Sequence, residues 1–238
     1  MKNQTVFKRY EIKFFLTEEQ CSMLKSLMID HMSEDEYGKS IIRNIYFDTP
    51  SYLLIRNSID KPVYKEKIRL RSYGVTGPDT TVFLELKKKF KGVVYKRRVK
   101  LKEREALSYI MDGVPLPESQ ISREIDYFIS YYKELMPKTV ISYEREAYYS
   151  KTDETFRITL DRNVMYRCTD LSLESAVYGK KILPEGKVLM EVKTAYAIPL
   201  WFTSFLSENK IYKTSFSKYG TAYTDIITEN KKETIKIC

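Results

Sequence analysis

The stretch KIRLRSYG, residues 67–74, alternates basic and aliphatic side chains. In a β-strand, successive side chains point to opposite faces of the sheet. Lys67, Arg69 and Arg71 therefore lie on one face, and the aliphatic residues between them lie on the other. Because a row of like charges repels itself, this face requires an opposite charge nearby. The segment predicts a strand with one packed face and one charged face that needs a partner.

The same alternation recurs along the chain. Each segment has one apolar face and one face that carries Arg, Lys or Glu, which predicts an antiparallel sheet. These segments are KRYEIKF (8–14), VFLELK (82–87), VVYKRRVK (93–100), SYEREAY (142–148), FRITLD (156–161) and VLMEVK (188–193), with the less regular IIRNIYFD at 41–48.

Two arrangements satisfy this pattern. In the first, an open sheet buries its apolar face and exposes its charged face to water. In the second, the sheet closes into a barrel whose charged interior holds water and a counter-charge, and the apolar faces pack beneath helices. Arginine recurs on the charged faces, and it is favoured where phosphate or carboxylate is bound through two hydrogen bonds. We therefore favour an α+β fold: a closed antiparallel β-barrel with helices packed outside it.

Helical signals are fewer. Thr17 and Gln20 form the pattern of a capping box, which predicts a helix to about residue 31. Thr49 followed by Pro50 predicts a short helix to about Arg56. Further helices are predicted at 120–135, 199–208 and 217–229. No linker or compositional break divides the chain, so residues 1–238 are expected to form a single domain.

The chain is basic, with 41 Lys and Arg against 32 Asp and Glu and a net charge of +9. This excess indicates an anionic partner, namely nucleic acid, a membrane surface or a phosphate-rich small molecule, or it only keeps the protein in solution. The 20 tyrosines could stack on bases. However, no RRM, KH or zinc-finger signature accompanies them, and the arginines fall on predicted inward faces. We expect no nucleic acid partner.

Cysteine and histidine are scarce. Cys21, Cys168 and Cys238 are far apart and odd in number, and His31 is the one histidine. Neither a disulfide framework nor a zinc site is indicated, and reduced thiols suggest an intracellular protein. The N-terminal residues lack the apolar stretch of a signal peptide, and no run of roughly 20 apolar residues predicts a transmembrane segment. We therefore expect a cytoplasmic protein.

Nine motifs in order carry a resemblance to a known family. They are RYEIKF, YFDTPSYLL, KIRLRSYG, FLELKKK, YKRR, SYERE, FRITLDRN, MEVK and SFSKYG. Together they resemble the VTC domain, the polyphosphate polymerase domain of the vacuolar transporter chaperone complex and its bacterial relatives. That domain belongs to the triphosphate tunnel metalloenzymes, also called the CYTH superfamily. The resemblance implies a barrel around a basic tunnel that binds a triphosphate with a divalent metal ion, Mn²⁺ or Mg²⁺.

The resemblance also assigns roles to residues. It places Glu191 as the metal ligand. It places Arg69, Arg71, Lys87, Arg157 and Lys218 as catalytic phosphate ligands. The remaining candidates for substrate binding are Arg9, Lys13, Glu85, Lys96, Arg98, Arg145, Lys193 and Ser217.

One position departs from the superfamily. Many tunnel enzymes begin with Glu-x-Glu-x-Lys, whose two glutamates hold metal, whereas here Arg9 replaces the first glutamate and Glu11 keeps the second. This resembles the polymerase branch more than the hydrolase branch. It argues against a hydrolytic site with two metal ions, although Glu11 remains available to one ion.

The resulting hypothesis is a polyphosphate polymerase-like phosphotransferase, which moves the γ-phosphate of ATP onto polyphosphate. The acceptor oxygen is already anionic and needs no general base, in keeping with the scarcity of histidine. The expected partners are ATP or another triphosphate and polyphosphate, and any coupling to transport requires a separate membrane partner. Two alternatives stay open: a tripolyphosphatase or nucleoside triphosphatase, and a non-catalytic module that binds polyphosphate or inositol phosphates.

Overall fold

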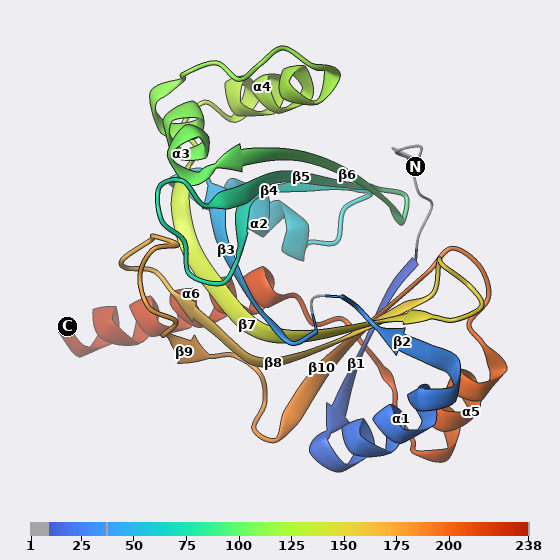
Figure 1. Ribbon diagram of the computed structural model, residues 1–238. Coiled ribbons are helices and arrows are strands. Elements are labelled where there is room, and N and C mark those ends of the chain that lie inside the picture. The colour runs from blue at the N-terminus through green and yellow to red at the C-terminus, as the bar shows by residue number, and fades with distance from the viewer. Residues whose placement is uncertain (1–9, 37, 238) are drawn as a thin grey trace.

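The structure, a computed structural model, describes residues 10–36 and 38–237, with side chains up to residue 230. Figure 1 shows the arrangement. The strands are β1 (Tyr10–Thr17), β2 (Met32–Glu34), β3 (Ser40–Asp48), β4 (Tyr64–Tyr73), β5 (Thr81–Phe90), β6 (Val93–Lys102), β7 (Met136–Ser150), β8 (Arg157–Arg167), β9 (Lys180–Lys181), β10 (Lys187–Thr194) and β11 (Lys213–Thr214). The helices are α1 (Glu18–His31), α2 (Leu53–Ile59), α3 (Glu103–Asp112), α4 (Gln120–Tyr132), α5 (Leu200–Glu208) and α6 (Lys218–Ile237).

All described strands join one sheet, and every pairing in it is antiparallel. The strand order is β11-β1-β10-β8-β7-β3-β4-β5-β6, with β2 beside β7 and β9 beside β8. This confirms the antiparallel sheet. How the chain divides into domains stays a prediction.

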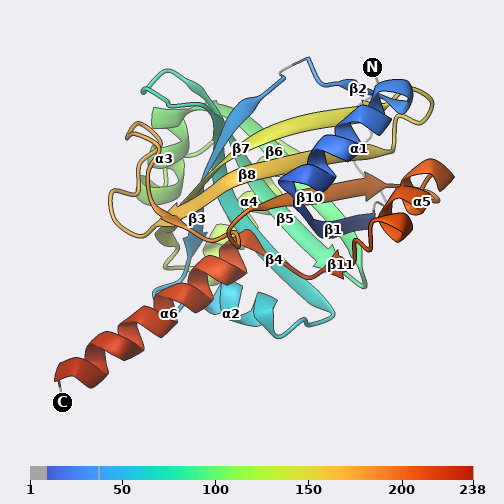
Figure 2. The ribbon, with the colours of Figure 1, turned by 90° about the horizontal axis from the view of Figure 1, so that it is seen from below.

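The prediction of a closed barrel is not confirmed, because the strand order is an open path between β11 and β6. The two ends approach each other through side chains instead: Lys87 Nζ on β5 donates to Glu11 Oε2 on β1 at 2.8 Å. The inner faces on both sides of this seam carry lysines, such as Lys13 and Lys96. Like charges resist the close approach that a backbone ladder would impose. Among the described strands, the sheet therefore curls strongly with no backbone ladder across the seam (Figure 2).

The apolar faces of the strands pack beneath helices, as the alternation predicts. Helices α3 and α4 cover β4–β6 in Figure 1, and Leu84 on β5 packs there with Phe128 on α4. Helices α1 and α5 cover β1, β8 and β10, where Ile158 packs with Phe202. Each of these side chains is at most 2% exposed. Burial of apolar surface contributes roughly 25 cal/mol per Å² to stability, so these cores stabilise the curved sheet.

Local signals explain the helix boundaries. The capping box at α1 is confirmed: Gln20 N donates to Thr17 Oγ1, and Thr17 N donates to Gln20 Oε1. The predicted start of the short helix at Pro50 is wrong, because α2 begins at Leu53. The N-cap residue of α2, Tyr52, has a left-handed backbone with φ of 59°, so the chain turns once more before the helix starts.

Asp48 joins α2 to α6. Its side chain is fully buried and accepts hydrogen bonds from the backbone N–H groups of Thr49, Leu54 and Ile55 at 2.8–3.0 Å. It also accepts one from the hydroxyl of Tyr219 on α6 at 3.0 Å. A carboxylate at a helix N-terminus is stabilised by these free N–H groups. Asp48 therefore fixes where the first turn of α6 sits against the sheet.

Within the described ranges, no helix combines the length and the apolar composition that crossing a bilayer requires.

We predict that Asp48→Ala lowers the free energy of unfolding by about 3 kcal/mol, because it leaves three buried N–H groups and one hydroxyl without their acceptor. Denaturant titration measures this loss. The matched control is Asp60→Ala at the exposed C-terminal end of α2, which should change stability by less than about 0.5 kcal/mol. A loss below about 1 kcal/mol for Asp48→Ala would show that Asp48 does not anchor the two helices.

Candidate functional site

The concave face of the sheet borders a cavity of about 2050 Å³. Strands from both halves of the sheet line it, together with the first turn of α6. Among the residues that the structure describes, sixteen lysine and arginine side chains line the cavity against four carboxylates. Such an excess of one charge inside a concave site attracts an anion.

Glu85 organises the cations of β4–β6. Its side chain is 1% exposed and accepts hydrogen bonds from Arg69 Nε at 2.9 Å and Arg69 Nη2 at 2.7 Å. Lys96 Nζ lies 2.6 Å from Glu85 Oε1, Arg98 Nε lies 3.3 Å from it, and Arg71 Nη1 lies 3.8 Å from Oε2. Burial by itself would raise the pKa of Glu85, but the surrounding cations, Arg69 first, outweigh burial and lower this pKa. Glu85 is therefore a fixed anion that holds four cations in place.

Neutral groups orient the same arginines. Arg69 Nη1 donates to the Tyr46 hydroxyl at 2.9 Å. Arg71 Nε donates to Asn44 Oδ1 at 2.9 Å, and its Nη2 donates to the Tyr143 hydroxyl at 3.2 Å. Since part of each guanidinium is already held, the remaining N–H groups are positioned before a ligand arrives.

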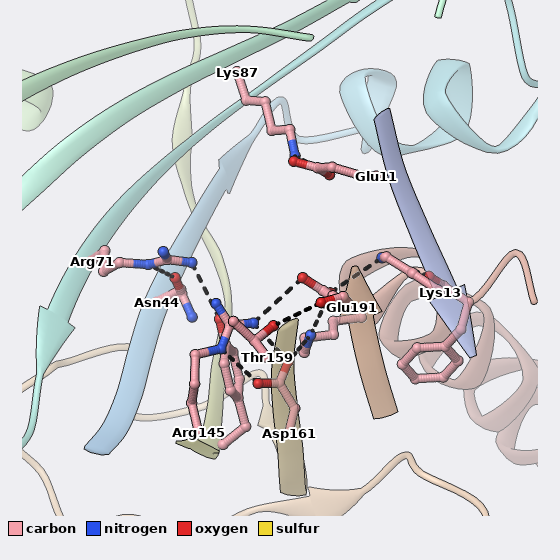
Figure 3. A network of polar contacts seen from close by, with 12 residues as sticks. Glu11, Lys13, Asn44, Arg71, Lys87, Arg145, Thr159, Asp161 and Glu191 are labelled. Atoms are coloured by element: carbon pink, nitrogen blue, oxygen red, sulfur yellow. Dashed lines mark hydrogen bonds and ion pairs between the residues drawn. The ribbon is translucent and has the colours of Figure 1, made fainter. Parts of the chain in front are cut away.

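A second cluster forms where β7, β8, β10 and α6 meet (Figure 3). Fully buried Asp161 accepts two hydrogen bonds from Arg145, from Nε at 2.6 Å and Nη2 at 2.7 Å. Lys218 Nζ lies 2.6 Å from Asp161 Oδ2 and donates to Glu191 Oε1 at 2.9 Å. Lys13 Nζ lies 3.5 Å from the same Glu191 oxygen. The cluster thus brings two carboxylates and three cations together at the wall of the cavity.

The neighbouring charges in this cluster hold Glu191 and Lys218 in their charged forms. Burial would raise the pKa of Glu191, but Lys218, followed by Lys13 and Arg145, holds it well below its usual value. Burial would also lower the pKa of Lys218, but Asp161 and Glu191 raise it. At neutral pH, Glu191 is therefore a carboxylate facing the cavity, available to a metal ion.

The residues at the start of α6 line the cavity. Ser217 Oγ accepts a hydrogen bond from Gly220 N at 3.2 Å, and Lys67 Nζ lies 3.5 Å from the same oxygen. Lys13 Nζ donates to the carbonyl of Phe216 at 2.8 Å. A Cβ atom at position 220 would come within 3.2 Å of Ser217, so glycine permits this tight turn. A helix N-terminus in this position favours an anion.

The VTC domain family profile matches residues 8–227 of the chain. The chain belongs to the VTC domain family. This confirms the family that the nine motifs predicted.

Two solved structures share the fold of this VTC domain. A proposed adenylate cyclase from Bacillus halodurans is 14% identical with a TM-score of 0.53, and the match covers 89% of this chain and 96% of that one. A proposed adenylyl cyclase from Hippeastrum, with a dominant triphosphatase activity, is 17% identical with a TM-score of 0.55, over 91% of this chain and 96% of that one. No curated protein matches the chain significantly. At these identities the similarity shows a common fold.

The cavity of this VTC domain brings together most of the predicted site residues. Glu85 lies just behind its wall, where it contacts four of them, and Arg9 lies outside the described residues. The roles of all these residues stay predictions. The residues that line the cavity are Lys13, Arg69, Arg71, Lys87, Lys96, Arg98, Arg145, Arg157, Glu191, Lys193, Ser217 and Lys218.

Arg157 lies apart from both clusters. Its Nη2 donates to Asp35 Oδ2 at 2.6 Å, and its side chain is 39% exposed. It therefore lines a more open part of the cavity than Arg145 does, whose side chain is 12% exposed.

Sequence reasoning assigned no role to several residues that the structure places in the site. Asp161 lies on the predicted inward face of FRITLD, and Lys67 is the first inward residue of KIRLRSYG. Alternation alone could have included both. The orienting groups Asn44, Tyr46 and Tyr143 gave no such signal, because their contacts depend on which strands pair.

The residues fit a divalent ion that is shared with a phosphate ligand. No three Asp, Glu, His or Cys side chains within the described ranges come together as a cage. However, Mg²⁺ is commonly bound by one or two carboxylates plus substrate phosphates, and the donors here are hard oxygens. Glu191 would supply the protein carboxylate. Asp161 is fully buried and does not line the cavity, whereas Glu191 does.

We predict that tripolyphosphate binding takes up protons at pH 8 and less so at pH 6. Burial lowers the pKa of Lys67 to about 7, and burial lowers those of Lys96 and Lys193 to about 8. These lysines are partly neutral at pH 8, and an entering anion raises their pKa, so protons bind with it. The affinity for tripolyphosphate should therefore fall as pH rises above 7. Calorimetry in two buffers of different ionisation enthalpy measures the uptake.

Lys67→Met should reduce the proton uptake at pH 8, whereas Lys88→Met, on the same sheet but outside the cavity, should leave it unchanged. Equal uptake at pH 6 and pH 8 in the unmodified protein would contradict the assignment of these lysines to the anion site.

Proposed function

We propose that this VTC domain is a polyphosphate polymerase-like phosphotransferase, which moves the γ-phosphate of ATP onto a polyphosphate chain with the help of a divalent ion. The observation that carries the proposal is the charge of the cavity, where sixteen described cations surround the carboxylate of Glu191 and three others. Membership of the VTC domain family supports it. Phosphoryl transfer asks mainly for positioning and neutralisation of charge, which this cavity supplies.

The arginines would hold the triphosphate in an extended line. Arg69 and Arg71 keep N–H groups for phosphate oxygens after their contacts with Glu85 and the neutral groups are made. Lys218 would contact the chain from the opposite wall, at the N-terminus of α6. Because these cations are positioned before binding, little reorganisation is needed as charge shifts between oxygens in the transition state.

Glu191 would hold Mn²⁺ or Mg²⁺ together with phosphate oxygens. When bound, such an ion neutralises charge on the phosphates and polarises the transferred phosphoryl group. Lys218 and Lys13 share the Glu191 carboxylate at 2.9 and 3.5 Å, so they would keep its charge balanced.

The reaction balances without a protein base. The bond between the γ-phosphorus and its bridging oxygen breaks, and ADP leaves with the electron pair. A new bond forms from the terminal oxygen of polyphosphate to that phosphorus. This oxygen is already anionic, so no proton has to be removed. The one histidine of the sequence, His31, stacks on Trp201 at 4.6 Å on the outer, helix-covered side of the sheet, consistent with chemistry that does not use it.

A second candidate is a tripolyphosphatase or nucleoside triphosphatase, favoured by the dominant triphosphatase activity of the Hippeastrum protein that shares this fold. The same cavity would then deliver the phosphoryl group to water. A non-catalytic polyphosphate or inositol phosphate binder is the third candidate. Incubation with ATP and Mn²⁺ distinguishes the three candidates. A polymerase makes ADP and long polyphosphate, a phosphatase releases orthophosphate, and a non-catalytic binding module leaves ATP unchanged.

We predict that Glu191→Gln lowers polyphosphate synthesis at least about 100-fold, because the substitution removes the carboxylate that would hold the ion. Tripolyphosphate affinity measured without metal should stay within about threefold or become tighter, since a negative charge leaves the anion site. Product analysis measures the synthesis of polyphosphate, and calorimetry measures the affinity for tripolyphosphate.

The control is Glu185→Gln, in the exposed turn before β10, which should leave both measurements unchanged. Undiminished synthesis by Glu191→Gln would remove Glu191 from the mechanism. Orthophosphate as the one product of the unmodified protein would replace the polymerase with the second candidate.

A further inference from the structure

The outer, apolar face of β4 and β5 continues past the helices that cover it. Ile68 and its cross-strand partner Leu86 are fully buried in the core beneath α3 and α4. Further along the same face, towards the turn between β5 and β6, the facing pair is Tyr64 and Phe90, which are 46% and 44% exposed. Apolar side chains therefore extend beyond the covered core at this end of the sheet, which lies to the right in Figure 1.

Neighbouring segments add further exposed apolar side chains. Tyr127 and Tyr131 on α4 stack at 6.3 Å and are 70% and 65% exposed. Burial raises the pKa of Tyr64, and Tyr127 contributes to the same shift, so the two rings are neighbours. Val63, next to Tyr64 in the chain, is 63% exposed. We refer to Val63, Tyr64, Phe90, Tyr127 and Tyr131 as the aromatic corner.

A buried contact ties the two parts of the aromatic corner together. The carboxylate of Glu66 on β4 accepts hydrogen bonds from the hydroxyls of Tyr64 at 2.5 Å and Tyr132 at 2.8 Å. Tyr132 belongs to α4, next to Tyr131. The strand and the helix therefore present their exposed rings as one surface.

Lysines surround this surface. Lys61 and Lys91 lie in the turns beside Val63 and Phe90, and Lys91 Nζ lies 5.5 Å from the centre of the Phe90 ring. Together, segments 60–66, 88–93 and 127–134 carry six lysines against three carboxylates. Glu66, one of those three, is already held by two tyrosine hydroxyls. The aromatic corner is therefore apolar at its centre and positively charged around it.

Two of these lysines occupy backbone conformations that disfavour lysine. Lys61 has a φ of 53° and Lys91 a φ of 46°, in the left-handed region that favours glycine and asparagine. The turn formed by Lys91 and Gly92 is of the kind that Asn-Gly or Asp-Gly usually fill. The local fold does not explain a lysine at either position, which points to a role for the charge.

We propose that the aromatic corner is a docking surface for an anionic lipid bilayer. Tyrosine rings are enriched at the level of lipid headgroups, where the ring is apolar and the hydroxyl is hydrated. Phe90 and Val63 would enter the boundary with the acyl chains, and the surrounding ammonium groups would contact lipid phosphates. Each lysine near an anionic bilayer strengthens such binding. This surface is separate from the proposed phosphoryl transfer and does not depend on it.

Charge and position favour a bilayer over two other occupants. In a symmetric dimer a surface meets itself, so the lysines of one copy would face those of the other and repel them. Proteins that bind single-stranded nucleic acid combine stacked rings with a cationic groove. Here Phe90, Tyr127 and Tyr131 lie outside the cationic cavity, on an end of the sheet.

The first experiment is co-sedimentation of the full chain with vesicles. The protein should bind vesicles of phosphatidylcholine and phosphatidylglycerol in equal parts at least about tenfold more tightly than vesicles of phosphatidylcholine alone. High salt should weaken this binding. Failure to bind the mixed vesicles, or equal binding to both kinds, would overturn the proposal.

The second experiment removes the exposed rings. In Tyr127→Ser/Tyr131→Ser, affinity for the mixed vesicles should fall about tenfold, while the affinity for tripolyphosphate stays within about twofold, because neither residue lines the cavity. The matched control is Tyr196→Ser/Tyr212→Ser, which removes two tyrosines of similar exposure from the loops beside α5. An equal loss of vesicle binding in this control would overturn the aromatic corner.

The third experiment uses two lysines in the same backbone conformation. Lys91→Asn should weaken binding to the mixed vesicles about fivefold, whereas Lys210→Asn, at a φ of 52° beyond the end of α5, should weaken it less than about twofold. Because asparagine suits this conformation, the melting temperature of each variant should equal or exceed that of the unmodified protein. Equal losses of vesicle binding would show that net charge alone drives it, and would overturn the proposal.

A fluorescent reporter tests whether the corner itself enters the lipid. In Phe90→Trp, the added indole should shift its emission to shorter wavelength with the mixed vesicles, whereas the unmodified protein, whose one tryptophan is Trp201 in α5, should show no shift. An unchanged emission in Phe90→Trp while the protein binds the vesicles would overturn the corner.

Two further measurements decide between occupants. Self-association of the free protein, measured by analytical ultracentrifugation and lost in Tyr127→Ser/Tyr131→Ser, would assign the surface to a second copy instead. Binding of single-stranded DNA that this variant weakens as much as it weakens vesicle binding would assign the surface to nucleic acid. Neither effect is expected from a surface that docks on lipid.

Discussion

The structure depends on keeping many cations on the concave face of one curled sheet. Unpaired charge in such a place is costly, so each region of the face needs a fixed anion. Glu85 provides it for β4–β6 and Asp161 for β7, β8 and α6. Both carboxylates are at most 1% exposed and contact cations of the cavity wall. The number of fixed anions is smaller than the number of cations, and this difference makes the cavity attractive to a polyanion.

This charged face is held by packing elsewhere. The apolar sides of the long strands are buried beneath α1, α3, α4 and α5, so β1, β3–β8 and β10 each link a core to the cavity. The first turn of α6 completes the wall, because Tyr219 stacks on Tyr46 at 4.6 Å and donates to Asp48. The position of Lys218, one residue earlier, follows from that contact. The wall between sheet and helix therefore depends on ring stacking and a buried hydrogen bond as well as on the ion pairs of Lys218 with Asp161 and Glu191.

The sequence predicted those parts of the structure that depend on residues close together in the chain. Alternation assigned the inward residues of β4, β5, β8 and β10 correctly, because the two faces of a strand follow from spacing alone. It could not determine whether the sheet closes, since closure depends on contacts between strands at opposite ends of the order, where Glu11 meets Lys87. Likewise, it did not show that Asp161 neutralises Arg145, because that pair requires the register of β7 against β8. The start of α2 was missed because Tyr52 adopts a left-handed backbone before the helix begins, which the Thr49-Pro50 pattern does not indicate.

Two kinds of cation line the cavity. The guanidinium groups of Arg69, Arg71 and Arg145 are planar and already held by carboxylates, amide or hydroxyl groups, so they offer fixed donors in fixed directions. Fixed donors are what a reacting phosphoryl group requires, because misplacement by about 1 Å can cost 100-fold in rate. The ammonium groups of Lys65 and Lys89 stand on flexible stems, so they can adjust to the position of an anion more freely than the guanidinium groups can.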